Sequence, residues 1–249
     1  MLNKARIDAK PIPQLSNQLT FSRGDAYSMQ EIQLETRKAA GETLIGWKMG
    51  LTSEAKRKQM NLDSPLYGFL TDKMQIKNND KYALAKQIHP KIEPEIAFWI
   101  AADLEGDVTD QQVLASCHAV CACLEILDSR YEQFKYFSME DVIADNSSSS
   151  QFILGPWLED YRDLDLSDLR MSMRKNGEEV EAGNSKDISG DPVLSVVELC
   201  KLLSQRGQKL KAGSVVLAGA ATPAIALEPG MRVDLIVHGL PPVSVEVAR

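Results

Sequence analysis

Two carboxylates stand two residues apart in a strand-like, mostly apolar run, His89-Pro-Lys-Ile-Glu-Pro-Glu-Ile-Ala-Phe-Trp-Ile100. Successive side chains of an extended chain alternate between faces, so Glu93 and Glu95 share a face with Ala97. Carboxylates this close raise each other's pKa, and desolvating them without a cation is costly. The pair therefore predicts either a cation site or a strand face that is open to solvent.

A third carboxylate, Glu125, is the lone charge in the next apolar run, residues 119–127. Three carboxylates suit a hard divalent ion such as Mg²⁺ or Mn²⁺, which prefers oxygen ligands and keeps positions for water or substrate. We therefore interpret Glu93, Glu95 and Glu125 as candidate ligands of one such ion. The alternative, a solvated face with accidental acids, stays open on spacing alone.

Lys48 is a second unusual charge, because it lies inside the short apolar run Leu44-Ile-Gly-Trp-Lys-Met-Gly50. Gly46 and Gly50 allow close backbone approach around it. We interpret Lys48 as a lysine that faces a pocket. The alternative is a side chain whose stem lies on apolar surface while its ammonium reaches water.

The composition is that of an ordinary globular protein, with 249 residues, 44% of them hydrophobic and 25% charged. A net charge of −7 argues against nucleic acid or an anionic membrane as the main partner. No apolar run approaches the roughly 20 residues of a membrane span, and the N-terminus lacks the apolar core of a signal peptide. We therefore expect a cytoplasmic protein, with its four cysteines as buried free thiols.

Capping patterns predict where helices begin. Ser28-Met-Gln-Glu31 predicts a helix to about Gly41, and Thr109-Asp-Gln-Gln112 predicts one to about His118. Ser138 opens a short helix, and Asp191-Pro192 opens one that ends before Gly207. Residues 53–61 also carry helix formers.

Strands dominate the second half of the chain. Asn176-Gly177 suits a type I′ turn between two strands, and residues 214–217, 231–237 and 243–247 also read as strands. The lysine-rich stretch 72–88 favours a boundary near residue 78. We therefore expect a smaller, largely helical N-terminal part over residues 1–78, and a β-rich part that binds metal and substrate over 79–249.

Donor groups gather in the loop Ala144-Asp-Asn-Ser-Ser-Ser-Ser150. We expect a set of residues to line a substrate pocket, namely Tyr67, Gly68, Asp145, Asn146, Ser148, Ser149 and Thr222. The alternative for the serines is a solvated loop.

Five motifs in one order carry a family resemblance: Gly46-Trp-Lys-Met-Gly-Leu-Thr52, Pro65-Leu-Tyr-Gly68, Lys91-Ile-Glu-Pro-Glu95, Leu124-Glu-Ile-Leu-Asp-Ser-Arg130 and Val142-Ile-Ala-Asp-Asn146. The chain resembles the 2-oxopent-4-enoate hydratase and 4-oxalocrotonate decarboxylase family of the fumarylacetoacetate hydrolase superfamily. Ser64-Pro-Leu-Tyr-Gly-Phe69 and Ser129-Arg-Tyr-Glu-Gln-Phe-Lys135 are more similar to the decarboxylase branch.

The resemblance implies an α+β fold, with a mixed β-sheet roll or barrel around a divalent metal. It also implies that Glu93, Glu95 and Glu125 are the ligands, that Lys48 is the pocket cation, and that Thr222 matches the family's threonine. The chain departs from the family at Ala218-Gly-Ala220, where Thr-Gly-Gly is frequent, and at Ser147, where Ala is frequent. A homo-oligomer and a complex with the hydratase of the same pathway are further implications.

The implied activity is Mg²⁺-dependent decarboxylation of 2-oxohex-3-enedioate, a 2-oxo dicarboxylate, to 2-hydroxypenta-2,4-dienoate and CO₂, in the meta-cleavage degradation of aromatic compounds. Catalysis by Lys48 belongs to this expectation. The alternative is the hydratase reaction, which adds water to the dienoate. Hydrolysis of a C–C bond ranks third because the chain has few histidines, and the intact charged residues argue against a non-catalytic subunit.

Overall fold

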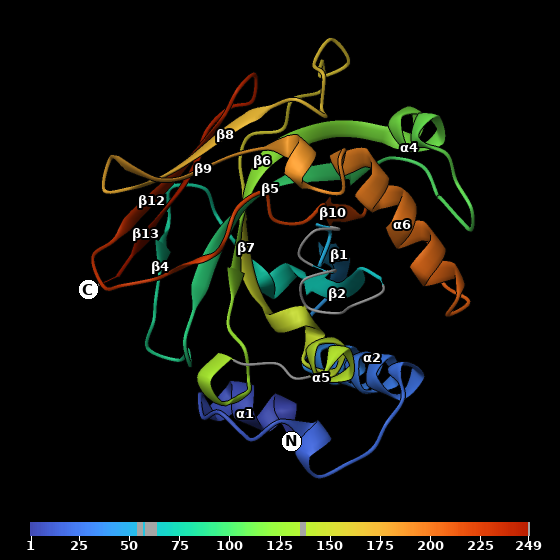
Figure 1. Ribbon diagram of the computed structural model, residues 1–249, viewed down its shortest axis with the longest axis vertical. Coiled ribbons are helices and arrows are strands. Elements are labelled where there is room, and N and C mark those ends of the chain that lie inside the picture. The colour runs from blue at the N-terminus through green and yellow to red at the C-terminus, as the bar shows by residue number, and fades with distance from the viewer. Residues whose placement is uncertain (54–56, 58–63, 135–137, 249) are drawn as a thin grey trace.

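Two β-sheets form the body of the molecule in this computed structural model, which describes residues 1–53, 57, 64–134 and 138–248. The larger sheet runs through the centre, and the smaller one packs beside it on the left of Figure 1. Most of the helix expected over residues 53–61 lies outside the described residues. The arrangement confirms the expected α+β class with a mixed sheet.

The larger sheet has eight strands among the described residues, and its path runs β2-β1-β10-β5-β6-β7-β3 with β11 paired to β5. Its strands are β1 (Leu44–Gly50), β2 (Leu66–Thr71), β3 (Gln75–Ile76), β5 (Lys91–Ile100), β6 (Cys117–Leu127), β7 (Ser149–Leu154), β10 (Val215–Leu217) and β11 (Ile225–Ala226). β1 is parallel to β10, whereas β5 and β6 form the long antiparallel pair at the centre. β10 therefore inserts between β1 and β5, although it comes much later in the sequence.

The smaller sheet has five strands in the order β4-β13-β12-β8-β9 among the described residues. They are β4 (Lys81–Tyr82), β8 (Arg170–Lys175), β9 (Glu178–Asn184), β12 (Arg232–Val237) and β13 (Val243–Val247). Asn176 and Gly177 turn between β8 and β9 with φ of 52° and 90°, so the expected hairpin is confirmed. β12 and β13 contact β6 and β7, which joins the two sheets through their apolar faces.

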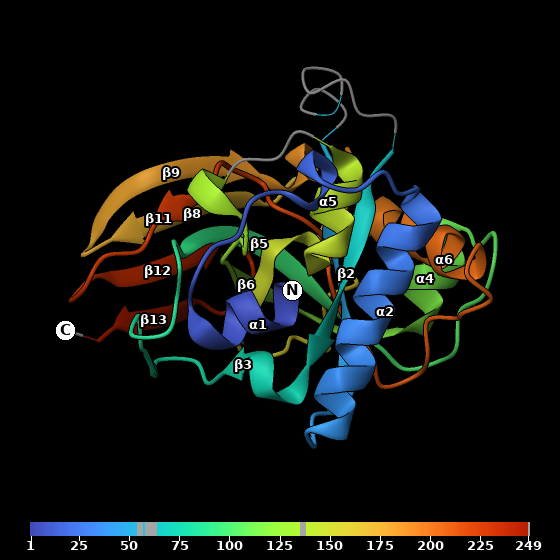
Figure 2. The same cartoon turned by 90° about the horizontal axis from the view of Figure 1, so that it is seen from below.

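Helices cover the edges of the larger sheet, with α2 running beside β2 and α4 beside α6 (Figure 2). They are α1 (Leu2–Asp8), α2 (Arg23–Ala39), α4 (Asp110–Ser116), α5 (Met139–Ala144) and α6 (Pro192–Ser204). Three predicted starts are confirmed, because Thr109, Ser138 and Asp191 cap α4, α5 and α6 through their side chains. α4 ends at Ser116 because Cys117 is already extended, at the start of β6.

The predicted start of α2 is wrong by six residues. Ser22 is the N-cap, and it forms the capping box with Asp25. Ser28, which was expected to cap the helix, instead donates to the carbonyl of Gly24 inside it. A short aspartate at the third helical position closes this box, whereas the usual pattern has glutamate or glutamine there.

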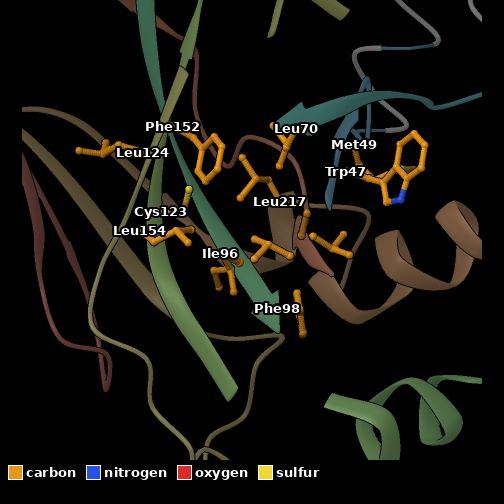
Figure 3. Close-up of a cluster of buried hydrophobic side chains, with 14 of the residues drawn as sticks. Trp47, Met49, Leu70, Ile96, Phe98, Cys123, Leu124, Phe152, Leu154 and Leu217 are labelled. Atoms are coloured by element: carbon orange, nitrogen blue, oxygen red, sulfur yellow. The ribbon is translucent and has the colours of Figure 1, made fainter. Parts of the chain in front are cut away.

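Apolar side chains from β1, β2, β5, β6, β7 and β10 form part of the buried core (Figure 3). Phe98, Cys123 and Phe152 are fully buried there. All four cysteines are free and buried, which confirms their prediction as core thiols.

The boundary expected near residue 78 stays a prediction. β1, β2 and β3 precede residue 78, and they belong to the same sheet as β5 and β6. None of the helices that the structure describes is both long and apolar enough for a bilayer crossing.

Gly46 offers a test of how tightly β10 fits against β1. A Cβ on Gly46 would lie 1.9 Å from the carbonyl oxygen of Val215 and 2.8 Å from its carbonyl carbon. Because both contacts are with backbone, we predict that Gly46→Ala lowers the free energy of unfolding by about 3 kcal/mol.

Gly24→Ala is the matched control, because a Cβ there meets only the Ser22 hydroxyl at 3.6 Å. This helical substitution should be neutral or stabilising by up to about 1 kcal/mol. Chemical denaturation measures both, and equal stability of the two variants would contradict the close approach of β10 to β1.

Candidate metal centre and active site

The three candidate ligands meet at the centre of the larger sheet. Glu93 on β5 lies directly opposite Glu125 on β6 in the strand register, and Glu95 lies opposite Cys123. One carboxylate oxygen from each glutamate lies within 4.8 Å of the others. Like charges directly opposite each other destabilise a strand pair, so this register needs a compensating cation.

Burial excludes a solvated strand face. Glu95 and Glu125 are fully buried. Glu95 Oε2 accepts a hydrogen bond from the Gly219 amide at 2.7 Å, whereas Glu95 Oε1 and both oxygens of Glu125 accept none. Buried carboxylate oxygens without donors carry a large desolvation cost.

Lys48 balances part of this charge. Its side chain is 3% exposed, and Nζ lies 2.8 Å from Glu125 Oε2. This contact is an ion pair between two buried side chains. Burial alone would lower the pKa of Lys48, but Glu125, Glu93 and Glu95 outweigh burial and raise it. Lys48 is therefore a buried ammonium, and its side chain does not reach water.

The remaining charge fits a divalent cation. Counted over these four described residues, three carboxylates and one ammonium sum to two negative charges, which one divalent ion would neutralise. The carboxylate oxygens without donors are hard ligands of the kind that Mg²⁺ and Mn²⁺ prefer. The residues present therefore fit the expected metal.

A strained turn closes the sheet beside this cluster. Asn146, Ser147 and Ser148 have φ of 50°, 53° and 57°, so three consecutive residues are left-handed. Each costs about 1–2 kcal/mol, so the surroundings must hold the turn in place.

Hydrogen bonds to β2 and to Arg130 keep the left-handed turn in place. Asn146 Oδ1 accepts from the Phe69 amide at 2.8 Å, and Asn146 Nδ2 donates to the Phe69 carbonyl at 3.1 Å. The buried guanidinium of Arg130 donates to the Asp145 carboxylate and to the Ser149 carbonyl. These contacts connect the start of β7 to β2.

A cavity of about 180 Å³ opens where Lys48, Glu93, Ser147 and Ser148 meet. Its apolar wall consists of Leu51, Leu127, Phe134 and Val142. Two hollows of about 750 and 790 Å³ lie elsewhere, and the second shares Thr52 and Ser53 with the small cavity. We place the chemistry in the small cavity because neither larger hollow is lined by the carboxylate cluster.

The residues predicted to line the pocket differ in their positions relative to the cavity. Ser148 lines the cavity, whereas Asp145 and Asn146 hold the turn. Gly68 lies beneath the turn, because a Cβ there would lie 2.7 Å from the Asn146 carbonyl oxygen. Ser149 is buried, and its hydroxyl makes no hydrogen bond.

Tyr67 and Thr222 do not line this cavity. The Tyr67 ring stacks on Tyr27 at 4.6 Å between centroids and meets the edge of Trp47. Thr222 is buried and donates to the Pro223 carbonyl. Their contact with substrate stays a prediction.

Ser147 and Thr52 line the cavity but were not among the predicted site residues. Thr52 ends the Gly46–Thr52 motif, so the motif itself could have indicated it. Ser147 stands between two predicted residues, Asn146 and Ser148, and all three have a left-handed backbone.

Comparison with known proteins places this site in a family. The profile described as "Fumarylacetoacetate (FAA) hydrolase C-terminal" matches residues 47–248. The chain belongs to the fumarylacetoacetate hydrolase family. This membership confirms the superfamily predicted from the motifs.

Relatives within the fumarylacetoacetate hydrolase family cover almost the whole chain. A 4-oxalocrotonate decarboxylase from Pseudomonas sp is 41% identical over 96% of this chain and 92% of its own length. A 2-hydroxyhexa-2,4-dienoate hydratase from Comamonas testosteroni is 35% identical over 94% of this chain and 89% of its own.

A solved structure has the same fold. It is a 4-oxalocrotonate decarboxylase from Pseudomonas putida G7 complexed with magnesium and adipate, and it matches with a TM-score of 0.95 and 36% identity. The match covers 99% of this chain and 94% of that one. The predicted resemblance to the decarboxylase branch is confirmed.

Replacing one carboxylate should separate metal binding from folding. We predict that Glu93→Gln, Glu95→Gln and Glu125→Gln each weaken Mg²⁺ binding by at least about 10- to 100-fold, because each removes an anionic ligand. Isothermal titration calorimetry measures the affinity, and Glu246→Gln is the control, because the Glu246 side chain is exposed on β13. Unchanged affinity in all three variants would remove the metal site.

The pKa of Glu95 predicts a proton linked to metal binding. Burial, then Glu125 and Glu93, raise this pKa well above its ordinary value. Without metal, the folded state therefore holds a proton that the unfolded state releases, and stability falls as pH rises from the ordinary pKa through the raised one.

A metal ion needs the ionised carboxylate, so Mg²⁺ binding should tighten with rising pH and release a proton. Calorimetry in two buffers of different ionisation enthalpy measures this release. Glu95→Gln should lose it, whereas heats in the wild type that do not depend on the buffer would contradict the raised pKa.

Proposed function

We propose that the chain is a Mg²⁺- or Mn²⁺-dependent decarboxylase that converts 4-oxalocrotonate, 2-oxohex-3-enedioate, to 2-hydroxypenta-2,4-dienoate and CO₂. The single observation that carries the proposal is the group of three carboxylates, two of them buried, in which Glu125 forms an ion pair with Lys48. The relatives named 4-oxalocrotonate decarboxylase support the choice of substrate. This reaction belongs to meta-cleavage degradation of aromatic compounds.

Glu93, Glu95 and Glu125 would hold the divalent ion at the inner end of the cavity. When bound, the ion would supply a Lewis acid for the 2-oxo group and the adjacent carboxylate of the substrate. The Gly219 amide fixes one oxygen of Glu95, which orients this carboxylate toward the other two.

The reaction breaks the bond between C5 and C6, and the C6 carboxylate leaves as CO₂. The electron pair of that bond forms the C4–C5 double bond, the C3–C4 double bond shifts to C2–C3, and negative charge develops on the C2 oxygen. Lys48, held as an ammonium by its acidic neighbours, would donate a hydrogen bond to this oxygen. The apolar wall of Leu127, Phe134 and Val142 would keep water from the departing group.

The turn before β7 contributes to substrate binding in this proposal. Ser148 would contact the substrate directly, and Asp145, Asn146, Gly68 and Ser149 would act by shaping the turn. We retain Tyr67 and Thr222 as weaker candidates, because their described contacts lie with other residues.

We further propose that the protein is cytoplasmic, assembles as a homo-oligomer and forms a complex with the hydratase of the same pathway. The resemblance to the hydratase and decarboxylase family supports these points. Light scattering of the purified chain, alone and mixed with that hydratase, measures both assemblies.

The second candidate function is hydration of 2-hydroxypenta-2,4-dienoate, which relatives named as hydratases favour. That reaction uses the same chelate but releases no CO₂. Incubating the pure protein with 2-oxohex-3-enedioate and Mg²⁺ while recording CO₂ therefore separates the two. Water addition to the dienoate without release of CO₂ would favour the hydratase.

Lys48→Met tests the role of the ammonium, since it keeps an unbranched apolar stem and deletes the charge. We predict that kcat falls by about 10²- to 10³-fold, because one well-placed donor to a developing oxyanion has an effect of this size. Metal affinity and the fold should remain close to those of the wild type.

Lys81→Met is the matched control, because the side chain of Lys81 is 68% exposed and pairs with Glu246 at the surface. Its rate should equal that of the wild type. If Lys48→Met also decarboxylates at nearly the parental rate, Lys48 serves the charge balance of the fold alone.

A further inference from the structure

Ser147 presents a hydroxyl that no described residue engages. The residue is 6% exposed and lines the cavity together with Lys48 and Glu93. Its neighbour Ser150, by contrast, donates its hydroxyl to Gln87. A nearly buried hydroxyl without a protein partner in a cavity is available to a ligand.

Contacts of the residues on both sides of Ser147 fix the direction of its side chain. Asn146 pairs with the amide and the carbonyl of Phe69, and the Ser148 amide donates to the Asp145 carbonyl at 3.0 Å. With φ of 53°, Ser147 points its side chain differently from an ordinary loop residue.

Gly50 makes the space that this hydroxyl occupies. A Cβ on Gly50 would lie 2.7 Å from Ser147 Oγ and 2.9 Å from Leu66 Cδ1. Gly50 and Lys48 are two residues apart on β1, so they share one face of the strand. Ser147 Oγ therefore lies over the same face of β1 as the Lys48 side chain.

The charges of the lining define what this hydroxyl would recognise. Among the described residues that line the cavity, Lys48 is the cation, and it is already paired with Glu125. A six-carbon dicarboxylate has two anionic ends, and the metal and Lys48 would serve the 2-oxo end. Among the described side chains of the lining, the donors left for the other carboxylate are hydroxyl groups.

A neutral donor also suits the chemistry of that second carboxylate. This group loses its charge as CO₂ departs, so a strong ion pair would stabilise the ground state more than the transition state. A hydroxyl recognises the group at a smaller cost to the rate.

We propose that Ser147 determines specificity for the dicarboxylate, by donating its hydroxyl to the carboxylate that leaves as CO₂. This inference rests on the proposed decarboxylase function, which it deepens. Lys91 is the rival donor, because its ammonium lies 4.5 Å from the centre of the Phe134 ring behind the apolar wall.

Binding of saturated analogues to the Mg²⁺-loaded protein tests the proposal without turnover. The probes are 2-oxohexanedioate, which keeps the second carboxylate, and 2-oxohexanoate, which lacks it. Neither has the double bond that takes up the electron pair. The variants are Ser147→Ala and Ser147→Gly, of which the glycine accepts the positive φ without strain, with Ser150→Ala as the control.

Both Ser147 variants should bind 2-oxohexanedioate about tenfold more weakly than the wild type, as expected for loss of one hydrogen bond to a charged group. Their affinity for 2-oxohexanoate should change by less than about twofold, and Ser150→Ala should bind both probes normally.

Three results would overturn the assignment: normal binding of 2-oxohexanedioate by both Ser147 variants, an equal loss for both probes, or a loss in Lys91→Met that is absent in the Ser147 variants. The proposed function fails separately. In that case, the wild type would release no CO₂ from 2-oxohex-3-enedioate, while the difference between the two probes would still report on Ser147.

Discussion

The like-charge register of β5 and β6 is the constraint on which the site depends. Glu93 faces Glu125 across the central strand pair, and Glu95 is buried beside them. In isolation this arrangement opposes strand pairing, whereas the surrounding apolar strands favour it. The fold therefore keeps an excess of negative charge at its centre, which Lys48 reduces and a divalent ion would remove. Such a sheet is suited to bind a cation, because the packing of its strands holds carboxylates close together.

The same constraint explains why much of the site could be predicted from the sequence. Glu93 and Glu95 are conspicuous because alternation places two acids on one face of an otherwise apolar strand, and Glu125 stands alone in a similar run. Lys48 is conspicuous in the same way, because it is a positive charge within a short apolar run. Helix starts at Thr109, Ser138 and Asp191 were predicted because their signals are local, and local hydrogen bonds satisfy them.

What could not be predicted depends on contacts between segments that are distant in the sequence. The left-handed turn at Ser147 exists because Phe69 and Arg130 hold its flanks, and no propensity within the turn indicates three such residues in succession. The sequence predicts Tyr67 in the substrate pocket, whereas the structure packs its ring against Tyr27 and Trp47. The start of α2 was misplaced because Ser28-x-x-Glu31 imitates a cap inside a helix that Ser22 had already begun.

The position of β10 has a consequence for the order in which the site is assembled. Lys48 lies on β1 and the carboxylates lie on β5 and β6, but β1 reaches them only through Val215–Leu217, which hydrogen-bonds to both β1 and β5. During synthesis on the ribosome, the chain must therefore emerge as far as Leu217 of its 249 residues before lysine and carboxylates share one sheet, as expected for a topology of high contact order. Until then the acids lack their protein counter-charge, and the nascent chain cannot form the complete constellation of charges.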